Sequence, residues 1–255
     1  MIVKGERESA TLIEAGKRLA HVLAAVKALV APGVSTETLD ELAERLIREG
    51  GDLPAFLGYR PEGARRAYPA TLCVSINDEI VHGIPNESPK TLHEGDIVSL
   101  DLGLEHEGVI VDAAVTVPVG RADKSSLELI LATERALVAG IKAAKPGARL
   151  GDVSAAIQKE IEGAGFTVVK ELGGHGVGGA VHEEPWIANF GRKGAGPELV
   201  EGQVLALEPI AAIGKGAIKV RPDGFTYATR DGSRSAQSEH TILLEKDGAR
   251  IVTAE

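Results

Sequence analysis

The stretch GDIVSLDLGLEHEGVIVDAAVTV, residues 95–117, predicts two β-strands joined by a short turn at LEHEG. Apolar residues alternate with small or polar residues on both sides of this turn, as in strands that bury one face. The opposite face of each strand carries one acid, Asp101 in the first strand and Asp112 in the second. Because the two acids lie about equally far from the turn, we expect them to face each other across the hairpin.

These two acids are unusual because their neighbours are small and apolar. Like charges placed opposite each other destabilise a sheet, and an isolated buried carboxylate is costly unless it takes up a proton. A divalent cation between Asp101 and Asp112 would remove both penalties. The alternative is a pair of solvated acids on an exposed face, and the apolar surroundings favour the metal site.

Two further acids border apolar strands. Glu208 ends the apolar run of GQVLALEPI, and Glu239 precedes the apolar strand of SAQSEHTILLE. With His175, the acids give a set of oxygen and nitrogen ligands that contains no thiolate. Such a set suits Mn, Fe, Co or Zn, and this number of hard ligands suits a site for two metal ions.

The segment GGHGVGGAVHEEP, residues 173–185, also matches the G-x-G-x-x-G pattern of dinucleotide-binding turns. That turn must open a helix after a strand. Here Pro185 and the β-branched and aromatic residues around it oppose a helix. We therefore interpret the glycines as room for the backbone near a metal site.

The chain shows signs of an internal duplication. Helices are predicted near residues 8–30 and over STETLDELAERLIREGG, residues 35–51, with Ser35 or Thr36 as N-cap and Gly50 as the stop. Two more follow near residues 126–144 and 148–165, and strands follow each pair. Pro32-Gly33 and Pro146-Gly147 match at an offset of 114 residues. We expect a pseudo-twofold α+β fold with helices covering a curved antiparallel sheet, as one domain over 1–255 with halves 6–120 and 121–255.

The composition limits the classes of function. A net charge of -9 argues against a nucleic-acid-binding protein, and the cluster Arg60, Arg65 and Arg66 is expected to be a solvated loop. The single cysteine, Cys73, fits a reducing compartment. The N-terminal stretch lacks the order of a signal peptide, and no apolar run is long enough for a membrane span. We expect a cytoplasmic protein.

The chain resembles the type I methionine aminopeptidases, which have the pita-bread fold. The resemblance runs from about residue 6 to the C-terminus. Its motifs, in their order and spacing, are INDEIVHGIP, GDIVSLDLG, VDAAVTV, GGHGVGGAVHEEP, LALEPI and SAQSEHT. The short segment between His182 and Glu208 resembles type I rather than type II. Without a Cys-rich extension before it, the chain resembles the short bacterial form.

The resemblance implies a role for each of these residues. Asp101 would bind one of two divalent ions (Co, Mn, Fe or Zn), Asp112 and Glu239 would bridge both, and His175 and Glu208 would hold the other. A water or hydroxide bridging the ions would be the nucleophile, with Glu208 as its acid/base partner. The implied reaction is hydrolysis of the first peptide bond, which releases an N-terminal methionine.

Two histidines outside the metal set also gain roles from the resemblance. His182 would contact the scissile peptide and stabilise the oxyanion, and His82 would lie beside the substrate and the leaving amine.

The pocket for the methionine side chain departs from the family pattern. Tyr59, Tyr68 and Cys73 match its expected positions, but RPEGARRA, residues 60–67, is longer than usual. Val181 stands where an aromatic residue is common, and Phe225 stands where a tryptophan is common. These changes keep an apolar wall and alter its volume, so they bear on side-chain preference and not on the metal site.

The resemblance also implies partners and leaves alternatives. The substrate would be the N-terminus of a peptide or nascent chain with a small second residue, with transient ribosome association possible and a monomer as the default state. One alternative is a proline-specific aminopeptidase of the same fold, which usually carries an Arg-containing motif where SAQSEHT stands and a large N-terminal domain. The other is an inactive pita-bread module that binds peptides, although all five ligands are present.

Overall fold

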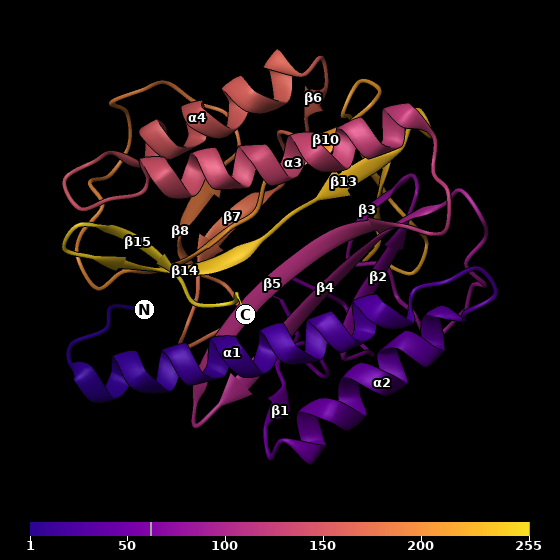
Figure 1. Ribbon diagram of the computed structural model, residues 1–255, viewed down its shortest axis with the longest axis horizontal. Coiled ribbons are helices and arrows are strands. Elements are labelled where there is room, and N and C mark those ends of the chain that lie inside the picture. Colours follow the sequence, from indigo (N-terminus) through magenta and orange to yellow (C-terminus); the bar gives the residue numbers. More distant parts are fainter. Residues whose placement is uncertain (62, 255) are drawn as a thin grey trace.

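The computed structural model describes residues 1–61 and 63–254; Glu62, within the 60–67 loop, and Glu255 lie outside the described residues. Two helix pairs lie at opposite ends of the view in Figure 1, and strands run between them. The helices are α1 (Glu6–Leu29), α2 (Thr36–Glu49), α3 (Lys124–Ala143) and α4 (Leu150–Gly163). The predicted helices are therefore confirmed to within about two residues at their ends.

The strands are β1 (Leu53–Pro54), β2 (Leu72–Ile76), β3 (Glu79–Val81), β4 (Ile97–His106), β5 (Val109–Pro118), β6 (Thr167–Val168), β7 (Gly173–Gly176), β8 (Glu183–Ala188), β9 (Val204–Leu207), β10 (Ile210–Ala212), β11 (Ile218–Val220), β12 (Tyr227–Thr229), β13 (Ser235–Gln237), β14 (His240–Glu245) and β15 (Gly248–Ile251). Neighbouring strands in these sheets pair antiparallel. The α+β class and the antiparallel sheet are thus confirmed.

Helix α2 illustrates how the local sequence sets these elements. Leu39, Ala43 and Ile47 recur at four-residue spacing and are fully buried, so the helix packs one stripe inward. It begins after Ser35, which has extended backbone, and ends before Gly50. Ser35 occupies the predicted N-cap position, but its side chain makes no capping hydrogen bond.

The duplication is visible in the helix boundaries. Helix α4 begins 114 residues after α2 begins, and it also ends 114 residues after α2 ends. One apolar core lies between α1, α2 and the β4–β5 hairpin, and a second lies between α3, α4 and strands β9 and β14. Each helix pair therefore covers its own group of strands. None of the helices in the described part of the chain is long and apolar enough to cross a lipid bilayer.

The β4–β5 hairpin has the predicted faces and a different register. Val98, Leu100, Leu102 and Leu104 are all fully buried against the helices. The turn consists of Glu107 and Gly108, both with positive φ, as a two-residue hairpin turn requires. This turn lies one residue beyond the predicted centre, so Asp112 pairs with Gly103, and Asp101 pairs with Ala114.

The prediction that Asp101 and Asp112 lie directly opposite each other is therefore wrong. The turn displaces the register by two residues, which makes the acids diagonal neighbours. A two-residue shift keeps both side chains on the same face, because side chains alternate with a period of two. Within residues 70–84, a turn at Asn77, whose φ is 56°, separates β2 from β3.

Candidate metal centre

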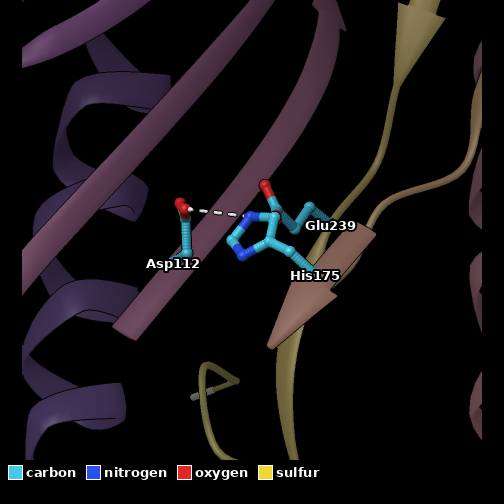
Figure 2. Close-up of side chains that lie close together, drawn as sticks. All are labelled: Asp112, His175 and Glu239. Carbon is cyan, nitrogen blue, oxygen red and sulfur yellow. Dashed lines mark ion pairs between the residues drawn. The ribbon is translucent and has the colours of Figure 1, made fainter. Parts of the chain in front are cut away.

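Three predicted ligands meet between the two halves of the fold. Asp112 comes from β5, His175 from β7, and Glu239 lies between β13 and β14 (Figure 2). One ligand atom from each lies within 4.8 Å of the others. Nε2 of His175 is 3.9 Å from Oδ2 of Asp112 and 3.9 Å from Oε1 of Glu239. These separations leave room for a cation between the side chains.

The remaining predicted ligands, Asp101 and Glu208, line the same pocket as these three residues. Glu208 follows β9 directly, and its Oε1 accepts a hydrogen bond of 2.6 Å from Nε2 of Gln237. The side-chain amide of Asn189 donates to the backbone carbonyl of Glu208 at 2.7 Å. The structure therefore brings all five predicted ligands to one pocket, with Glu208 fixed at two atoms.

Unpartnered oxygen atoms test whether this site fits a cation. Oδ1 of Asp101, Oδ1 of Asp112 and Oε1 of Glu239 are buried and have no hydrogen-bond partner among the described residues. Leaving a buried polar atom unpaired costs about 1–3 kcal/mol, and more for a charged group. His175 donates from Nδ1 to the carbonyl of Gly176 at 2.9 Å. In the neutral ring Nε2 therefore carries the lone pair, and this atom faces the acids. The donor set thus fits a divalent cation.

The electrostatics of the metal-free site point the same way. Burial raises the pKa of Asp101 to about 7, and it raises the pKa of Asp112 and Glu239 well above the usual range, with repulsion from neighbouring acids adding to the effect. Burial lowers the pKa of His175 to about 3. Near neutral pH the imidazole is therefore neutral and available as a ligand, while the acids retain protons until a cation compensates their charge.

A short antiparallel contact holds β5 against residues 237–241. Ala114 and Glu239 exchange two backbone hydrogen bonds, of 2.8 and 3.3 Å. On one side of this pair, the hydroxyl of Thr241 accepts from the N–H of Asp112 at 2.9 Å and donates to its carbonyl at 2.7 Å. This contact joins the halves at the two acids that the resemblance assigns as bridging ligands.

The other end of the contact has the same pattern of hydrogen bonds. The hydroxyl of Thr116 accepts from the N–H of Gln237 at 2.9 Å and donates to its carbonyl at 2.7 Å. Both threonines are buried. Counted outward from the Ala114–Glu239 pair of this antiparallel contact, Thr241 lies opposite Asp112, and Thr116 lies opposite Gln237. Thr116 and Thr241, here called the threonine clasp, therefore substitute a hydroxyl for a main-chain partner at each end.

Glycines let the strands approach each other around His175. A Cβ added to Gly174 would lie 2.2 Å from the carbonyl oxygen of Ala206, and one added to Gly176 would lie 2.3 Å from that of Glu184. Only glycine fits at such distances. The segment forms β7 and leads into β8, and it opens no helix, so the dinucleotide interpretation is excluded.

His182 lies beside His175, although the first is exposed and the second is buried. Their ring centroids are 4.5 Å apart. Nδ1 of His182 forms a hydrogen bond of 2.9 Å with the hydroxyl of Tyr59. His82 lines the same pocket, and burial lowers its pKa to about 4. The structure thus places both predicted substrate-contacting histidines at the metal pocket.

An apolar recess opens from the metal site. It contains every predicted side-chain pocket residue, namely Tyr59, Tyr68, Cys73, Val181 and Phe225. The sequence analysis missed Phe56, which also lines it. Phe56 lies on a segment without a recognisable motif, so only the packing against Gly103 of β4 reveals its position.

Arg66 lies in the predicted loop with its side chain 41% exposed, and it also has partners outside that loop. Its guanidinium forms a two-pronged ion pair with Glu87 and donates to the carbonyl of Asp223 at 3.1 Å. It also lies over the ring of Phe225, 5.3 Å from the centroid. Arg66 therefore supports one wall of the recess, and nothing in its local sequence indicates this, because its partners are 21 and more residues away.

Comparison with known proteins agrees with this site. The sequence profile described as metallopeptidase family M24 matches residues 10–246. Methionine aminopeptidase 1 of Bacillus subtilis (strain 168) is 40% identical over 253 residues, which cover 99% of each chain. A crystal structure of methionine aminopeptidase from Thermotoga maritima superposes with a TM-score of 0.94 at 42% identity, covering 100% of both chains.

A more distant similarity concerns the fold alone. The Xaa-Pro dipeptidase from Bacillus anthracis has a TM-score of 0.77 at 21% identity, and this chain covers 62% of that one. The shared architecture confirms the predicted fold, which the solved structure from Thermotoga maritima shows over its full length.

The raised pKa values predict how the stability of the metal-free protein depends on pH. Asp101 holds a proton in the folded state up to about pH 7, and its ordinary pKa is 3.8. Its stabilising contribution is therefore complete below about pH 4 and is lost as the pH rises through 7, and Asp112 and Glu239 act in the same direction. The lowered pKa values of His175 and His82 act in the opposite direction, but only below about pH 6.5. We therefore expect the free energy of unfolding, measured with urea in the presence of a chelator, to fall between pH 6.5 and pH 8.

Two comparisons test the origin of this slope. Saturating Mn²⁺ or Co²⁺ should stabilise the protein by about 2.7 kcal/mol at pH 8 when the free ion is at 100 times its dissociation constant. The same ion concentration should stabilise it less at pH 5, because protons then compete with the ion for the acids. Asp101→Asn should flatten the slope of the metal-free protein. A chelated protein that is more stable at pH 8 than at pH 6.5 would contradict the assignment.

The threonine clasp predicts an effect on metal affinity. Thr241→Val keeps the side-chain shape and leaves the N–H and carbonyl of Asp112 without a partner. We expect the affinity for Co²⁺ or Mn²⁺, measured by calorimetry, to fall by about 10- to 100-fold, as for other groups that orient metal ligands. Thr229→Val is the matched control, because Thr229 is equally buried and its hydroxyl bonds only Ser233. Equal metal affinities of the two variants would refute the role of the clasp.

Proposed function

We infer that this chain, which belongs to metallopeptidase family M24, is a metal-dependent methionine aminopeptidase. It hydrolyses the first peptide bond of a peptide or protein and releases the N-terminal methionine. The observation that carries this conclusion is the pocket in which five potential ligands and an apolar recess meet. Similarity over the full length of methionine aminopeptidases supports it.

We propose that the five ligands hold two divalent ions, which Co, Mn, Fe or Zn could provide. In this proposal Asp112 and Glu239 would share both ions, Asp101 would bind one of them, and His175 and Glu208 would bind the other. The unpartnered oxygens of Asp101, Asp112 and Glu239 support this arrangement. When bound, such ions lower the pKa of a coordinated water molecule, so that it can act as the nucleophile near neutral pH.

Glu208 is proposed as the acid/base residue. It is partly open to the pocket, and burial and the charges of Asp101 and Asp112 raise its pKa well above the usual range. A bound cation would lower this pKa, so the proposed proton transfer rests on the position of Glu208 at the pocket. The hydrogen bond from Gln237 holds one of its oxygens, so the carboxyl group is oriented before the substrate arrives.

His182 and His82 are proposed to act on the substrate. With the hydroxyl of Tyr59 donating to Nδ1, His182 carries its proton on Nε2 and can donate to the oxygen of the scissile carbonyl as negative charge develops there. His82 lies at the same pocket and is proposed to contact the leaving amine. Its lowered pKa keeps it neutral at pH 7, so it can act as an acceptor.

The recess is proposed to receive the methionine side chain. Its wall is formed by the apolar and aromatic residues Phe56, Val181 and Phe225, with Tyr59, Tyr68 and Cys73 beside them. The hydroxyl of Tyr68 is already bonded to the carbonyl of Gly83 at 2.9 Å, so it offers no free polar group. An unbranched apolar side chain suits such a recess. We propose a small second residue in the substrate.

The alternatives have less support. All five ligands of an active site are present, which opposes an inactive peptide-binding module. The likeness to an Xaa-Pro dipeptidase is one of fold, at 21% identity. The segment SAQSEHT also stands where the proline-specific enzymes usually carry an Arg-containing motif.

We further propose that the chain is one metallo-aminopeptidase domain over residues 1–255, acting as a monomer on nascent chains in the cytoplasm, with transient ribosome association. The single, buried free thiol of Cys73 and the net charge of -9 support a reducing compartment and a protein that does not bind nucleic acid by itself.

Peptide assays test this activity directly. We expect the protein loaded with Co²⁺ or Mn²⁺ to release methionine from Met-Ala and Met-Gly peptides, and a chelator to stop the reaction. Peptides of the form X-Pro should remain intact. Cleavage of X-Pro peptides alone would assign the protein to the proline-specific enzymes, and peptide binding without turnover in every metal would assign it to the inactive modules.

Asp112→Asn tests the central ligand. The amide keeps the shape of the side chain but removes the negative charge that two ions would share. We expect activity on Met-Ala peptides to fall below detection and the metal content, measured by atomic emission, to decrease. The circular dichroism spectrum should stay unchanged as a control for folding. A variant with full activity would remove Asp112 from the site.

A further inference from the structure

A second cleft adjoins the metal pocket. It shares four residues with the metal pocket, namely His82, His175, His182 and Glu208. Its other lining residues come from β3, from the segment before β7, and from β8. They are Val81, Glu171, Leu172, Gly173, Glu183, Glu184 and Trp186. Because both cavities meet at the same histidines, a chain bound across the metal site can occupy both.

The outer part of this cleft combines an aromatic ring with acids. Side chains alternate along β8, so Glu184 and Trp186 lie on the same face of that strand. Trp186 is 50% exposed, which is unusual for so large an apolar side chain. Glu171 and Glu184 are also exposed, and no lysine or arginine from the described residues lines the cleft.

Glu183 does not add to this free negative charge. Its carboxylate accepts from the N–H groups of Gly179 and Ala180 at 2.6 and 2.9 Å, and it is paired with the amino group of Met1. The described structure gives no ion pair to Glu171 or Glu184. The charge that a ligand meets in the outer cleft is therefore carried by these two glutamates, next to Trp186.

We propose that this cleft binds the substrate residues that follow the scissile bond, and that it favours lysine or arginine at the third to fifth positions. The proposal rests on the proposed function, since it extends the same substrate. An extended chain advances about 3.3 Å per residue, so the third to fifth residues lie roughly 7 to 13 Å beyond the first residue. Strand β8 is at the edge of its sheet, with β7 on only one side, so a chain can lie along it.

The aromatic ring and the two acids of the outer cleft favour a lysine or arginine side chain. A lysine or arginine side chain can place its cationic group over the indole of Trp186 while its charge is balanced by Glu171 and Glu184. An acidic side chain in the same place would meet two like charges. An uncharged apolar residue would gain contact with Trp186 but would leave the glutamates uncompensated. The cleft therefore differs from the recess, which selects by shape.

Kinetics on matched peptides test the preference. Met-Ala-Lys-Gly-Gly, Met-Ala-Gln-Gly-Gly and Met-Ala-Glu-Gly-Gly share the first two residues and differ only in charge at the third. For the metal-loaded enzyme at low salt, we expect kcat/KM for the lysine peptide to exceed that for the glutamate peptide by about three- to tenfold, as partly exposed charges allow. The ratio should shrink at 0.5 M salt, because exposed charges are screened.

Variants test which residues cause the preference for the lysine peptide. Glu171→Gln combined with Glu184→Gln should bring the three peptides to within about twofold of one another. Glu41→Gln is the matched control, because Glu41 is exposed on α2 and does not line the cleft. This control should keep the ratio of the unmodified enzyme. An equal loss of the ratio in both variants would show an effect of net charge and overturn the proposal.

Fluorescence gives a readout independent of turnover, because Trp186 is the only tryptophan of the chain. A Met-Ala-Lys peptide whose first peptide bond is reduced to a methylene amine binds without hydrolysis. We expect its binding to the metal-loaded enzyme to shift the tryptophan emission, and the double glutamine variant to bind it more weakly. An unchanged emission spectrum at saturating peptide would overturn the placement of the substrate along Trp186.

The outcomes separate this proposal from the proposed function. Equal kcat/KM for the three peptides, with methionine released from each, would overturn the cleft preference and leave the aminopeptidase activity intact. A higher kcat/KM for a leucine peptide than for the lysine peptide would replace the charge preference with an apolar one. No release of methionine from any peptide would overturn the proposed function, and the fluorescence titration would still decide whether the cleft binds the peptide.

Discussion

The structure depends on the contact between β5 and residues 237–241. Two backbone hydrogen bonds between Ala114 and Glu239 join the halves of the fold, and the threonine clasp extends the contact at both ends. The same contact sets Asp112 and Glu239 side by side, because each lies on one of the joined segments. The interface between the halves and the centre of the metal site are therefore the same few residues, and neither can change without the other.

This arrangement carries an electrostatic cost that explains why the site suits cations. Burial and mutual repulsion raise the pKa of the acids, so the metal-free protein is least favoured when they are ionised. A cation offsets the repulsion and supplies partners for the unpaired oxygens of Asp101, Asp112 and Glu239. Repulsion of this kind destabilises the ionised metal-free site and favours the binding of cations there.

The site is open on two sides, and the two sides select by different means. The recess beside Phe56 and Phe225 is apolar and closely walled, so shape decides which side chain enters. The cleft beside Trp186 is exposed and acidic, so charge would contribute there. His82 and His182 line both cavities, so they lie where the proposed scissile bond would be held.

The sequence by itself determined the helices, the duplication and the kinds of ligand. Periodicity located the helix pairs, because a stripe of buried residues must recur with the helical turn, and the alternation around Asp101 and Asp112 revealed both faces of the hairpin. The tertiary structure alone decided the register of that hairpin, since a turn centred one residue later displaces the pairing by two. It also decided the roles of Thr241, Gln237 and Arg66. Each acts on a group between 21 and 157 residues away in the chain, and a contact of that kind leaves no periodic or local signal in a single sequence.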